Sequence, residues 1–146
     1  RPDDEALMRE YEATLSEETV KQFMSEVISL EERTSHKRLI PVCHADFDRQ
    51  IPLIALVDGK IAGLARLAKV PLTAHARIVM QVADAYQKQG LGQYFMEKCL
   101  KIASIEKIDK VVMKFFKENT AMTKLATVAG FEMKEKEEIV DAVKVF

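Results

Sequence analysis

The sequence predicts an α/β (α+β) fold in which helices pack against a mixed sheet. Apolar residues follow helical spacing in the N-terminal third and then change to short apolar runs. The tight hairpin turn Asp58-Gly59-Lys60 makes the strands on either side of it antiparallel. The second half of the chain alternates strand and helix patterns, which is typical of layered α/β architecture.

Two helices are predicted before the first strand. Residues 1–5 lead into the first helix with acidic residues, and Ser16 is the expected N-cap of the second. Their apolar faces consist of Leu7, Met8, Tyr11 and Leu15 in the first helix and Val20, Phe23, Met24 and Val27 in the second. We expect the charged residues 31–38 to be exposed and residues 39–42 to form a short helix or loop.

Apolar runs predict the strands. They cover residues 53–57, 61–67, 76–82, 111–116, 131–133 and 143–146. A helix follows the third run, with an apolar stripe formed by Leu91, Phe95, Cys99 and Ile102. A further helix covers residues 119–129 and ends at Gly130. The order contains no repeats or linkers, and we expect a single domain over residues 1–146.

Composition narrows the classes of function. The formal net charge of -1 gives no overall attraction to nucleic acid or to a membrane surface, so we expect neither as a partner. No apolar run approaches the ~20 residues of a membrane span, and no signal peptide is visible. Cys43 and Cys99 match neither a metal-binding nor a redox spacing. We therefore expect no metal, a cytoplasmic location, and a monomer or weak dimer.

The loop Gln87-Lys88-Gln89-Gly90-Leu91-Gly92 lies between a predicted strand and a predicted helix. Its two glycines allow the backbone to approach a ligand, and the helix directs free N–H groups toward it, so the loop suits a pyrophosphate. The dinucleotide fingerprint needs a third glycine where this chain has Phe95. The nucleoside-triphosphate loop needs Lys-Ser/Thr where this chain has Gln93-Tyr94. A plain turn before a helix is the alternative for this motif alone.

Two segments together resemble one family. Residues 82–100, with the pattern Gln87-x-x-Gly90-x-Gly92, are similar to the acetyl-CoA-binding motif of the GNAT N-acetyltransferases. The helix that starts at Asn119 and ends at Gly130-Phe131 is similar to the second signature of that family. The resemblance implies a mixed central sheet with splayed strands 4 and 5, helices on both faces, and acetyl-CoA as the acyl-donor co-substrate.

A closer likeness covers most of the chain. Residues 1–5, 15–20, 44–49 and 63–67 resemble the protein lysine acetyltransferases, a subgroup often fused to acyl-CoA-synthetase-like or cyclic-nucleotide-binding domains. The likeness implies an acetyl-CoA-dependent N-acetyltransferase whose acceptor amine is a protein lysine. A small-molecule amine N-acetyltransferase and a CoA-binding module of low activity remain as alternatives.

The resemblance also implies which residues bind acetyl-CoA. They are Gln81, Val82, Gln87, Lys88, Gln89, Gly90, Leu91, Gly92, Gln93, Asn119 and Met122. Backbone N–H groups of the loop would hold the pyrophosphate, with Lys88 as a charge-assisted donor, and the strand end at Val82 would pair with the pantetheine amides. A solvated side chain is the alternative for Lys88, and a helix N-cap is the alternative or additional role for Asn119.

The catalytic groups depart from the family pattern. Freeing the lone pair of a lysine with a pKa of ~10.4 at pH 7 costs roughly 4.6 kcal/mol, so a general base or a desolvating pocket is expected. Arg77 occupies the usual position of that base, and Ala126 occupies the position of the frequent tyrosine acid. His75, on the same strand face as Arg77, and Asp46 are the catalytic candidates. Arg77 and Lys114 also suggest an acidic substrate, unless both are ordinary surface cations.

Overall fold

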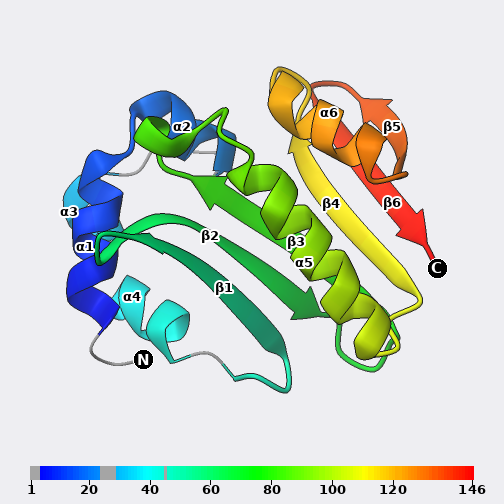
Figure 1. Cartoon of the computed structure of the whole chain (residues 1–146), viewed down its shortest axis with the longest axis horizontal. Helices are drawn as coiled ribbons and strands as arrows, with labels where there is room; N and C mark the ends of the chain where they lie inside the picture. The colour runs from blue at the N-terminus through cyan, green and yellow to red at the C-terminus, as the bar shows by residue number, and fades with distance from the viewer. Residues whose placement is uncertain (1–3, 24–28, 45) are drawn as a thin grey trace.

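The computed structural model describes residues 4–23, 29–44 and 46–146, which form a twisted six-stranded sheet with helices on both faces (Figure 1). The strands lie in the order β1-β2-β3-β4-β6-β5. They are β1 (Gln50–Val57), β2 (Lys60–Lys69), β3 (His75–Val82), β4 (Lys110–Phe116), β5 (Glu132–Lys136) and β6 (Ile139–Val145). The helices are α1 (Glu5–Thr14), α2 (Glu17–Phe23), α3 (Leu30–Arg33), α4 (His36–Cys43), α5 (Leu91–Ile105) and α6 (Thr120–Val128), with a 3-10 turn η2 (Asp84–Tyr86).

The two central strands, β3 and β4, pair only at their beginnings. They are the single parallel pair of the described sheet, and their pairing runs from His75 and Lys110 to Arg77 and Val112. Beyond these residues β3 stays with β2 and β4 stays with β6, so the two halves of the sheet diverge (Figure 1). The mixed sheet with a splayed pair is therefore confirmed, and the pair is the third and fourth strand of this chain.

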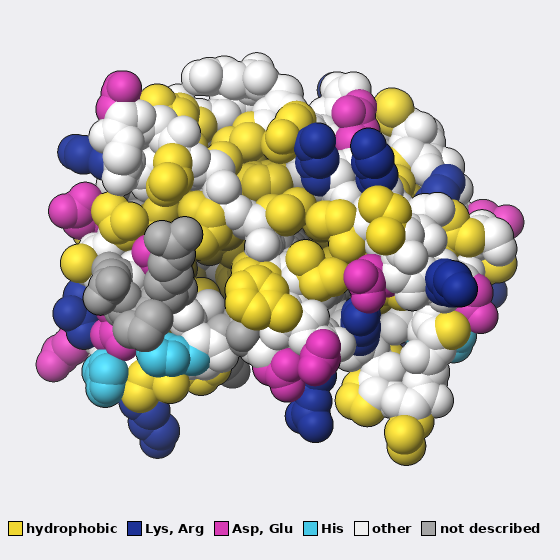
Figure 2. Space-filling model, turned by 60° about the horizontal axis from the view of Figure 1, so that its bottom comes forward, with side chains coloured by type: hydrophobic (Ala, Val, Ile, Leu, Met, Phe, Trp, Pro, Cys, Tyr) yellow, Lys and Arg dark blue, Asp and Glu magenta, His cyan; other side chains and the backbone are white. Residues whose placement is uncertain are grey.

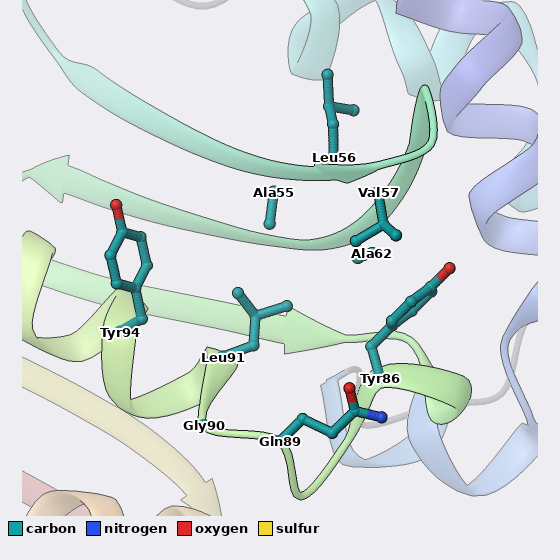
Figure 3. A pocket seen from close by; sticks show the side chains of 9 residues that line it. All are labelled: Ala55, Leu56, Val57, Ala62, Tyr86, Gln89, Gly90, Leu91 and Tyr94. Atoms are coloured by element: carbon teal, nitrogen blue, oxygen red, sulfur yellow. The ribbon is translucent and has the colours of Figure 1, made fainter.

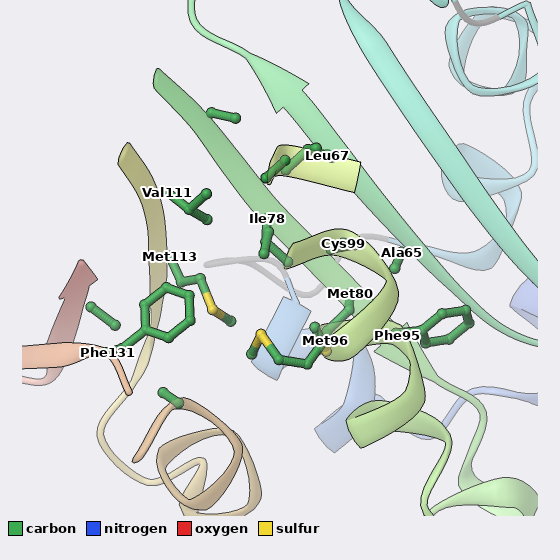
Figure 4. Packing of buried hydrophobic residues seen from close by; sticks show 14 of the residues in the cluster. Ala65, Leu67, Ile78, Met80, Phe95, Met96, Cys99, Val111, Met113 and Phe131 are labelled. Carbon is green, nitrogen blue, oxygen red and sulfur yellow. The ribbon is translucent and has the colours of Figure 1, made fainter. Parts of the chain in front are cut away.

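Side-chain alternation along the strands assigns the helices to the two faces. Ile78 and Met80 of β3 and Met113 of β4 point to the face that α5 and α6 cover, where they form the main core (Figure 4). The opposite face carries a smaller core under α1 and α4. Its buried residues are Met8, Tyr11, Leu39, Cys43, Ile61 and Ala83. The predicted helices of residues 91–105 and 119–129 thus lie on one face, and the N-terminal helices lie on the other.

The N-terminal helices follow the prediction in part. Met8 and Tyr11 of α1 are buried, as its apolar spacing indicates, and so is Val20 of α2. Met24 and Val27, which the sequence places on the second helix, lie outside the described residues. The charged segment 31–38 is exposed or half-buried, and it contains most of α3 and the start of α4.

The hairpin between β1 and β2 turns as predicted. Asp58 and Gly59 both have positive φ, 50° and 76°, which is the combination that a two-residue hairpin needs. β1 forms one edge of the sheet and leaves Ile54, Leu56 and Val57 exposed. Figure 2 turns this lower side of the molecule forward and shows hydrophobic side chains gathered on it.

The C-terminal hairpin is longer than the sequence predicts. The expected strands covered residues 131–133 and 143–146, whereas β5 continues to Lys136 and β6 begins at Ile139. The two strands pair from Glu132 and Val143 to Lys136 and Ile139. Lys and Glu dominate the outer part of β5, which is exposed, so this part has no apolar pattern. In the described part of the chain no helix has the length and apolarity needed to cross a membrane.

Candidate functional site

A cleft of about 870 Å³ runs along the diverging strands β3 and β4. Ile78 and Met80 line it together with residues of α5 and α6, whereas Arg77, Val79 and Gln81 point to the opposite face, where α2 supplies Thr19, Gln22 and Phe23. The cleft therefore has two sides, which we name the α5 side and the α2 side. The splay connects them through the sheet.

The glycine loop on the α5 side leaves backbone donors without a protein partner. Gly90 is the N-cap residue of α5, with φ of +86° and no side chain to cap the helix. The first bond of the helix runs from the Tyr94 N–H to the Gly90 carbonyl at 3.0 Å. The N–H groups of Leu91, Gly92 and Gln93 therefore point out of the helix end without a partner among the described residues. This arrangement suits an anion such as a pyrophosphate.

Helices α5 and α6 approach each other closely at Gly92. A Cβ atom at this position would lie 3.0 Å from Cδ1 of Leu125, so a larger residue would require the Leu125 side chain to shift. The N-terminus of α6, unlike that of α5, is capped, because Asn119 Oδ1 accepts a hydrogen bond from the Met122 N–H at 3.1 Å. Asn119 also lines the cleft, so the cap and the predicted contact with the donor are compatible.

A hydrogen-bond network joins α2 to the glycine loop. The Asp84 carboxylate accepts from the N–H and the hydroxyl of Ser16, each at 2.8 Å, and from the Thr19 hydroxyl at 2.6 Å. The Gln87 side-chain amide donates to Thr19 Oγ1 and to the Val82 carbonyl, each at 3.1 Å. Burial alone would raise the pKa of Asp84, but the hydrogen bonds from Thr19 and Ser16 outweigh it and lower this pKa. The loop and the wall of the α2 side are thus positioned together.

Tyr11 fixes the side chain of Gln81 on the α2 side. The hydroxyl of this fully buried tyrosine lies 3.1 Å from Gln81 Oε1 and 3.3 Å from the Gln81 carbonyl oxygen. Burial, with the nearby Glu12 and Asp84 carboxylates, raises the pKa of Tyr11 far above its ordinary value. The hydroxyl therefore stays protonated and serves as a donor. No spacing in the sequence indicated this contact, because the two residues are 70 positions apart.

The structure brings together the predicted donor-binding residues with one exception. All of them line the cleft except Gln89. Gln89 lies in an adjoining pocket of about 360 Å³, beside Tyr86, Leu91 and Tyr94 (Figure 3). Its side-chain amide donates to the Ala85 carbonyl at 3.2 Å, which stabilises the turn before the loop.

The two catalytic candidates lie away from the cleft. His75 begins β3, with its Nε2 atom 3.6 Å from Asp109 Oδ1, and a strand rise of ~3.3 Å per residue puts it about 20 Å from the glycine loop. Asp46 lies in the loop before β1, where it accepts from the Asp48 N–H at 3.1 Å and pairs with Arg49 at 3.6 Å. The structure therefore does not place either side chain among the residues that line the cleft.

Cations occupy the α2 side instead. Arg77 and Lys114 are exposed residues that line the cleft there. Among the described lining residues the one carboxylate is Glu97, on the outer part of α5, which accepts from the Gln93 amide at 3.1 Å. The two thiols offer no alternative nucleophile, since burial raises the pKa of Cys99 to about 11 and also raises that of Cys43. No cluster of metal-binding side chains occurs in the described ranges.

The model of the acetyltransferase (GNAT) family matches residues 7–131. The chain belongs to the GNAT family. As a GNAT acetyltransferase it uses acetyl-CoA as the donor and an amine as the acceptor. The uncapped helix end, the neighbouring Lys88 and the splayed strands fit this donor, because they offer N–H donors and a cation to a pyrophosphate and a strand edge to an amide-bearing arm.

Solved structures of GNAT proteins share the fold at low sequence identity. The GNAT domain of S. lividans PAT matches with a TM-score of 0.87 and 21% identity, over 99% of this chain and 86% of that one. PaiA N-acetyltransferase from Thermoplasma acidophilum, solved with coenzyme A, matches with a TM-score of 0.73 and 14% identity, over 99% and 94%. Spermidine N-acetyltransferase from Vibrio cholerae, solved with CoA and spermine, matches with a TM-score of 0.78 and 12% identity, over 98% and 90%. No curated protein matches the chain by sequence.

Proposed function

We propose that this GNAT acetyltransferase acetylates the side-chain amine of a lysine in a protein. The observation that carries the proposal is the passage between β3 and β4, because it connects the two sides of the cleft. The donor would bind on the α5 side, and a lysine side chain would enter from the α2 side. The likeness of residues 1–5, 15–20, 44–49 and 63–67 to the protein lysine acetyltransferases supports a protein acceptor.

The chain holds the donor mainly with its backbone. The N–H groups of Leu91, Gly92 and Gln93 would bind the pyrophosphate, and Lys88 would add a charge-assisted contact. Residues 78–82 of β3 no longer pair with β4, so their free backbone groups would pair with the amides of the pantetheine arm. When bound, acetyl-CoA supplies a thioester as the activated acyl group.

The acceptor amine must lose a proton before it attacks. The ammonium first gives one proton to solvent. The nitrogen then forms a bond to the acetyl carbon, the carbon–sulfur bond breaks, and the second proton that the nitrogen loses goes to the departing sulfur, so that coenzyme A leaves as a thiol. The described residues that line the α2 side include no carboxylate or imidazole to take the first proton. We therefore expect kcat/KM to rise about tenfold per pH unit between pH 7 and 9, in step with the free fraction of an amine of pKa ~10.4.

Calorimetry and mass spectrometry test the proposal in two steps. Titration with acetyl-CoA should show binding, and NAD and ATP should not bind. Incubation with acetyl-CoA and a set of folded proteins should then add acetyl groups to lysines, as read by mass spectrometry. Rapid turnover of spermidine without any protein modification would contradict a protein acceptor and support the small-molecule alternative.

A CoA-binding module of low activity is the second candidate. The position usually held by the base carries Arg77, and the described residues of the α2 side include no other base. This candidate predicts normal acetyl-CoA affinity with no acetyl transfer to any protein, peptide or small amine between pH 7 and 9. Measurable transfer that rises with pH would exclude it.

A further inference from the structure

We propose that the acceptor lysine is selected by acidic residues next to it in the acceptor protein, which pair with a row of cations on the α2 side. This inference rests on the proposed function and concerns the choice of acceptor. The row consists of Arg66 on β2, Arg77 on β3 and Lys114 on β4, and we name it the basic row.

The register of the sheet places these three side chains on one face. Arg66 pairs with Val79 and Arg77 pairs with Ala68, so the two arginines are diagonal neighbours on adjacent strands. Val112 is the partner of Arg77 across the parallel pair, and Lys114 lies two residues further along β4. Residues two apart on a strand share a face, so the basic row crosses β2, β3 and β4 diagonally at the point where β3 and β4 stop pairing.

The positive charge of the basic row is poorly balanced. Arg77 makes no ion pair with a described residue, and Arg66 donates only to the neutral Gln50 Oε1 atom, at 3.3 Å. Lys114 Nζ lies 3.8 Å from Asp141 Oδ1, with both side chains exposed, and such a pair is weak. Asp141 stands opposite Lys114 in the ladder between β4 and β6 and opposite Lys134 in the ladder between β5 and β6, so it has a cation on each side. The basic row therefore has positive charge available for a ligand.

This charge favours acidic segments and disfavours basic ones. Arg77 and Lys114 line the cleft into which the acceptor lysine would reach, so residues beside that lysine would approach them. A guanidinium binds a carboxylate through two parallel hydrogen bonds, whereas arginine or lysine next to the acceptor would be repelled. A strongly basic tail or a polyamine would meet the same repulsion.

Three blocked peptides test the inference. Each has one central lysine, flanked on both sides by two glutamates, two serines or two arginines. With the wild-type chain and acetyl-CoA, we expect kcat/KM for the glutamate peptide to exceed that for the serine peptide about tenfold, and the arginine peptide to be the poorest. Raising the salt to 1 M, where the Debye length is about 3 Å, should remove most of the difference.

Charge reversal provides the decisive comparison. Arg77→Glu should invert the order of the glutamate and arginine peptides. Lys101→Glu, the same charge change at an exposed position of α5 outside the cleft lining, should leave the order unchanged. Unfolding midpoints and acetyl-CoA affinity show whether Arg77→Glu remains folded and binds the donor. If it does not, Arg77→Gln and Lys114→Glu replace it, and each should narrow the preference.

Equal kcat/KM for the three peptides, or a preference that survives Arg77→Glu, would overturn the inference while leaving the acetyltransferase assignment intact. Peptide affinities measured by calorimetry with coenzyme A present give the same comparison without turnover, and equal affinities would also overturn it. A further comparison of kcat/KM uses Nα-acetyl-lysine, which has a free α-carboxylate, and its amide, which has none. It shows whether the cations bind the α-carboxylate of a small acceptor or acidic residues next to a lysine in a protein. If Nα-acetyl-lysine outperforms the glutamate peptide, the acceptor is a small amino acid and the inference of an acidic protein segment is wrong.

Discussion

The α5 side and the α2 side of the cleft offer different kinds of groups to a ligand. On the α5 side the donors are backbone N–H groups, which the positive φ of Gly90 and the uncapped start of α5 expose. On the α2 side the available groups are exposed side chains, above all Arg77 and Lys114. On the proposals made above, donor recognition would depend on backbone conformation, whereas acceptor recognition would depend on charge. Substitutions should therefore affect the two sides in different ways.

Two glycines with the same conformation give the largest predicted difference. Gly90 and Gly59 have φ of +86° and +76°, and a Cβ atom at either would meet nothing within 4 Å. Gly90→Val and Gly59→Val should each cost about 1–2 kcal/mol of unfolding free energy, since both strain the backbone. Only Gly90→Val displaces the N–H groups, so its Kd for acetyl-CoA in calorimetry should rise about 100-fold. Equal affinities in the two variants would contradict a backbone-built site.

Two substitutions of Lys88 distinguish the effect of its charge from the effect of its backbone conformation. Its φ is 60°, a value that favours glycine. Lys88→Ala and Lys88→Gly should both raise the Kd for acetyl-CoA about fivefold, because both remove the charge-assisted contact. In thermal unfolding the glycine variant should be the more stable, by about 1 kcal/mol, because it relieves the strain. An unchanged Kd would support a solvated Lys88 side chain.

The charge of Asp84 holds the hydrogen bonds that join α2 to the glycine loop, and removing this charge tests their contribution to stability. Its pKa is lowered in the folded protein, so its contribution to stability is complete above the unfolded pKa of ~3.9 and is lost as pH falls through the folded pKa. Asp84→Asn should lower the unfolding free energy by about 0.5–1 kcal/mol at pH 7, because solvent weakens the bonds of this exposed carboxylate, and by less at pH 3. Urea unfolding at both pH values measures this. Asp58→Asn, in the hairpin turn, is the matched control and should change stability by less than about 0.5 kcal/mol.

The smallest effect is expected on the α2 side. Asp141→Asn removes the weak partner of Lys114 and should change stability by less than about 0.5 kcal/mol. The released charge should raise kcat/KM for the glutamate-flanked peptide about twofold, with no change in acetyl-CoA affinity. A loss of activity with this peptide would indicate that Asp141 positions Lys114 for the acceptor instead of competing with it.

The α5 side was predictable from the sequence because its determinants are local. Two glycines between a strand and a helix specify both the exposed N–H groups and the missing cap. The contacts of Asp84 were not predictable, because it meets Ser16 across 68 positions and no spacing links them. Such contacts depend on how separate helices pack on the sheet.

His75 shows what strand periodicity leaves open. The period of two places the side chains of His75 and Arg77 on the same face of β3. It does not indicate how far along the strand the cleft begins. His75 lies where β3 and β4 still pair, before the sheet opens. The splay decides which residues line the cleft, and it begins where β3 and β4 stop pairing, beyond Arg77 and Val112.

The splay would also link the stability of the folded chain to the binding of its donor. Residues 78–82 have no strand partner on the β4 side, and the donor arm would serve as that partner. A ligand that binds only the folded chain stabilises it by about 2.7 kcal/mol at 100 times its Kd. The unfolding midpoint of the chain should therefore rise with the concentration of acetyl-CoA.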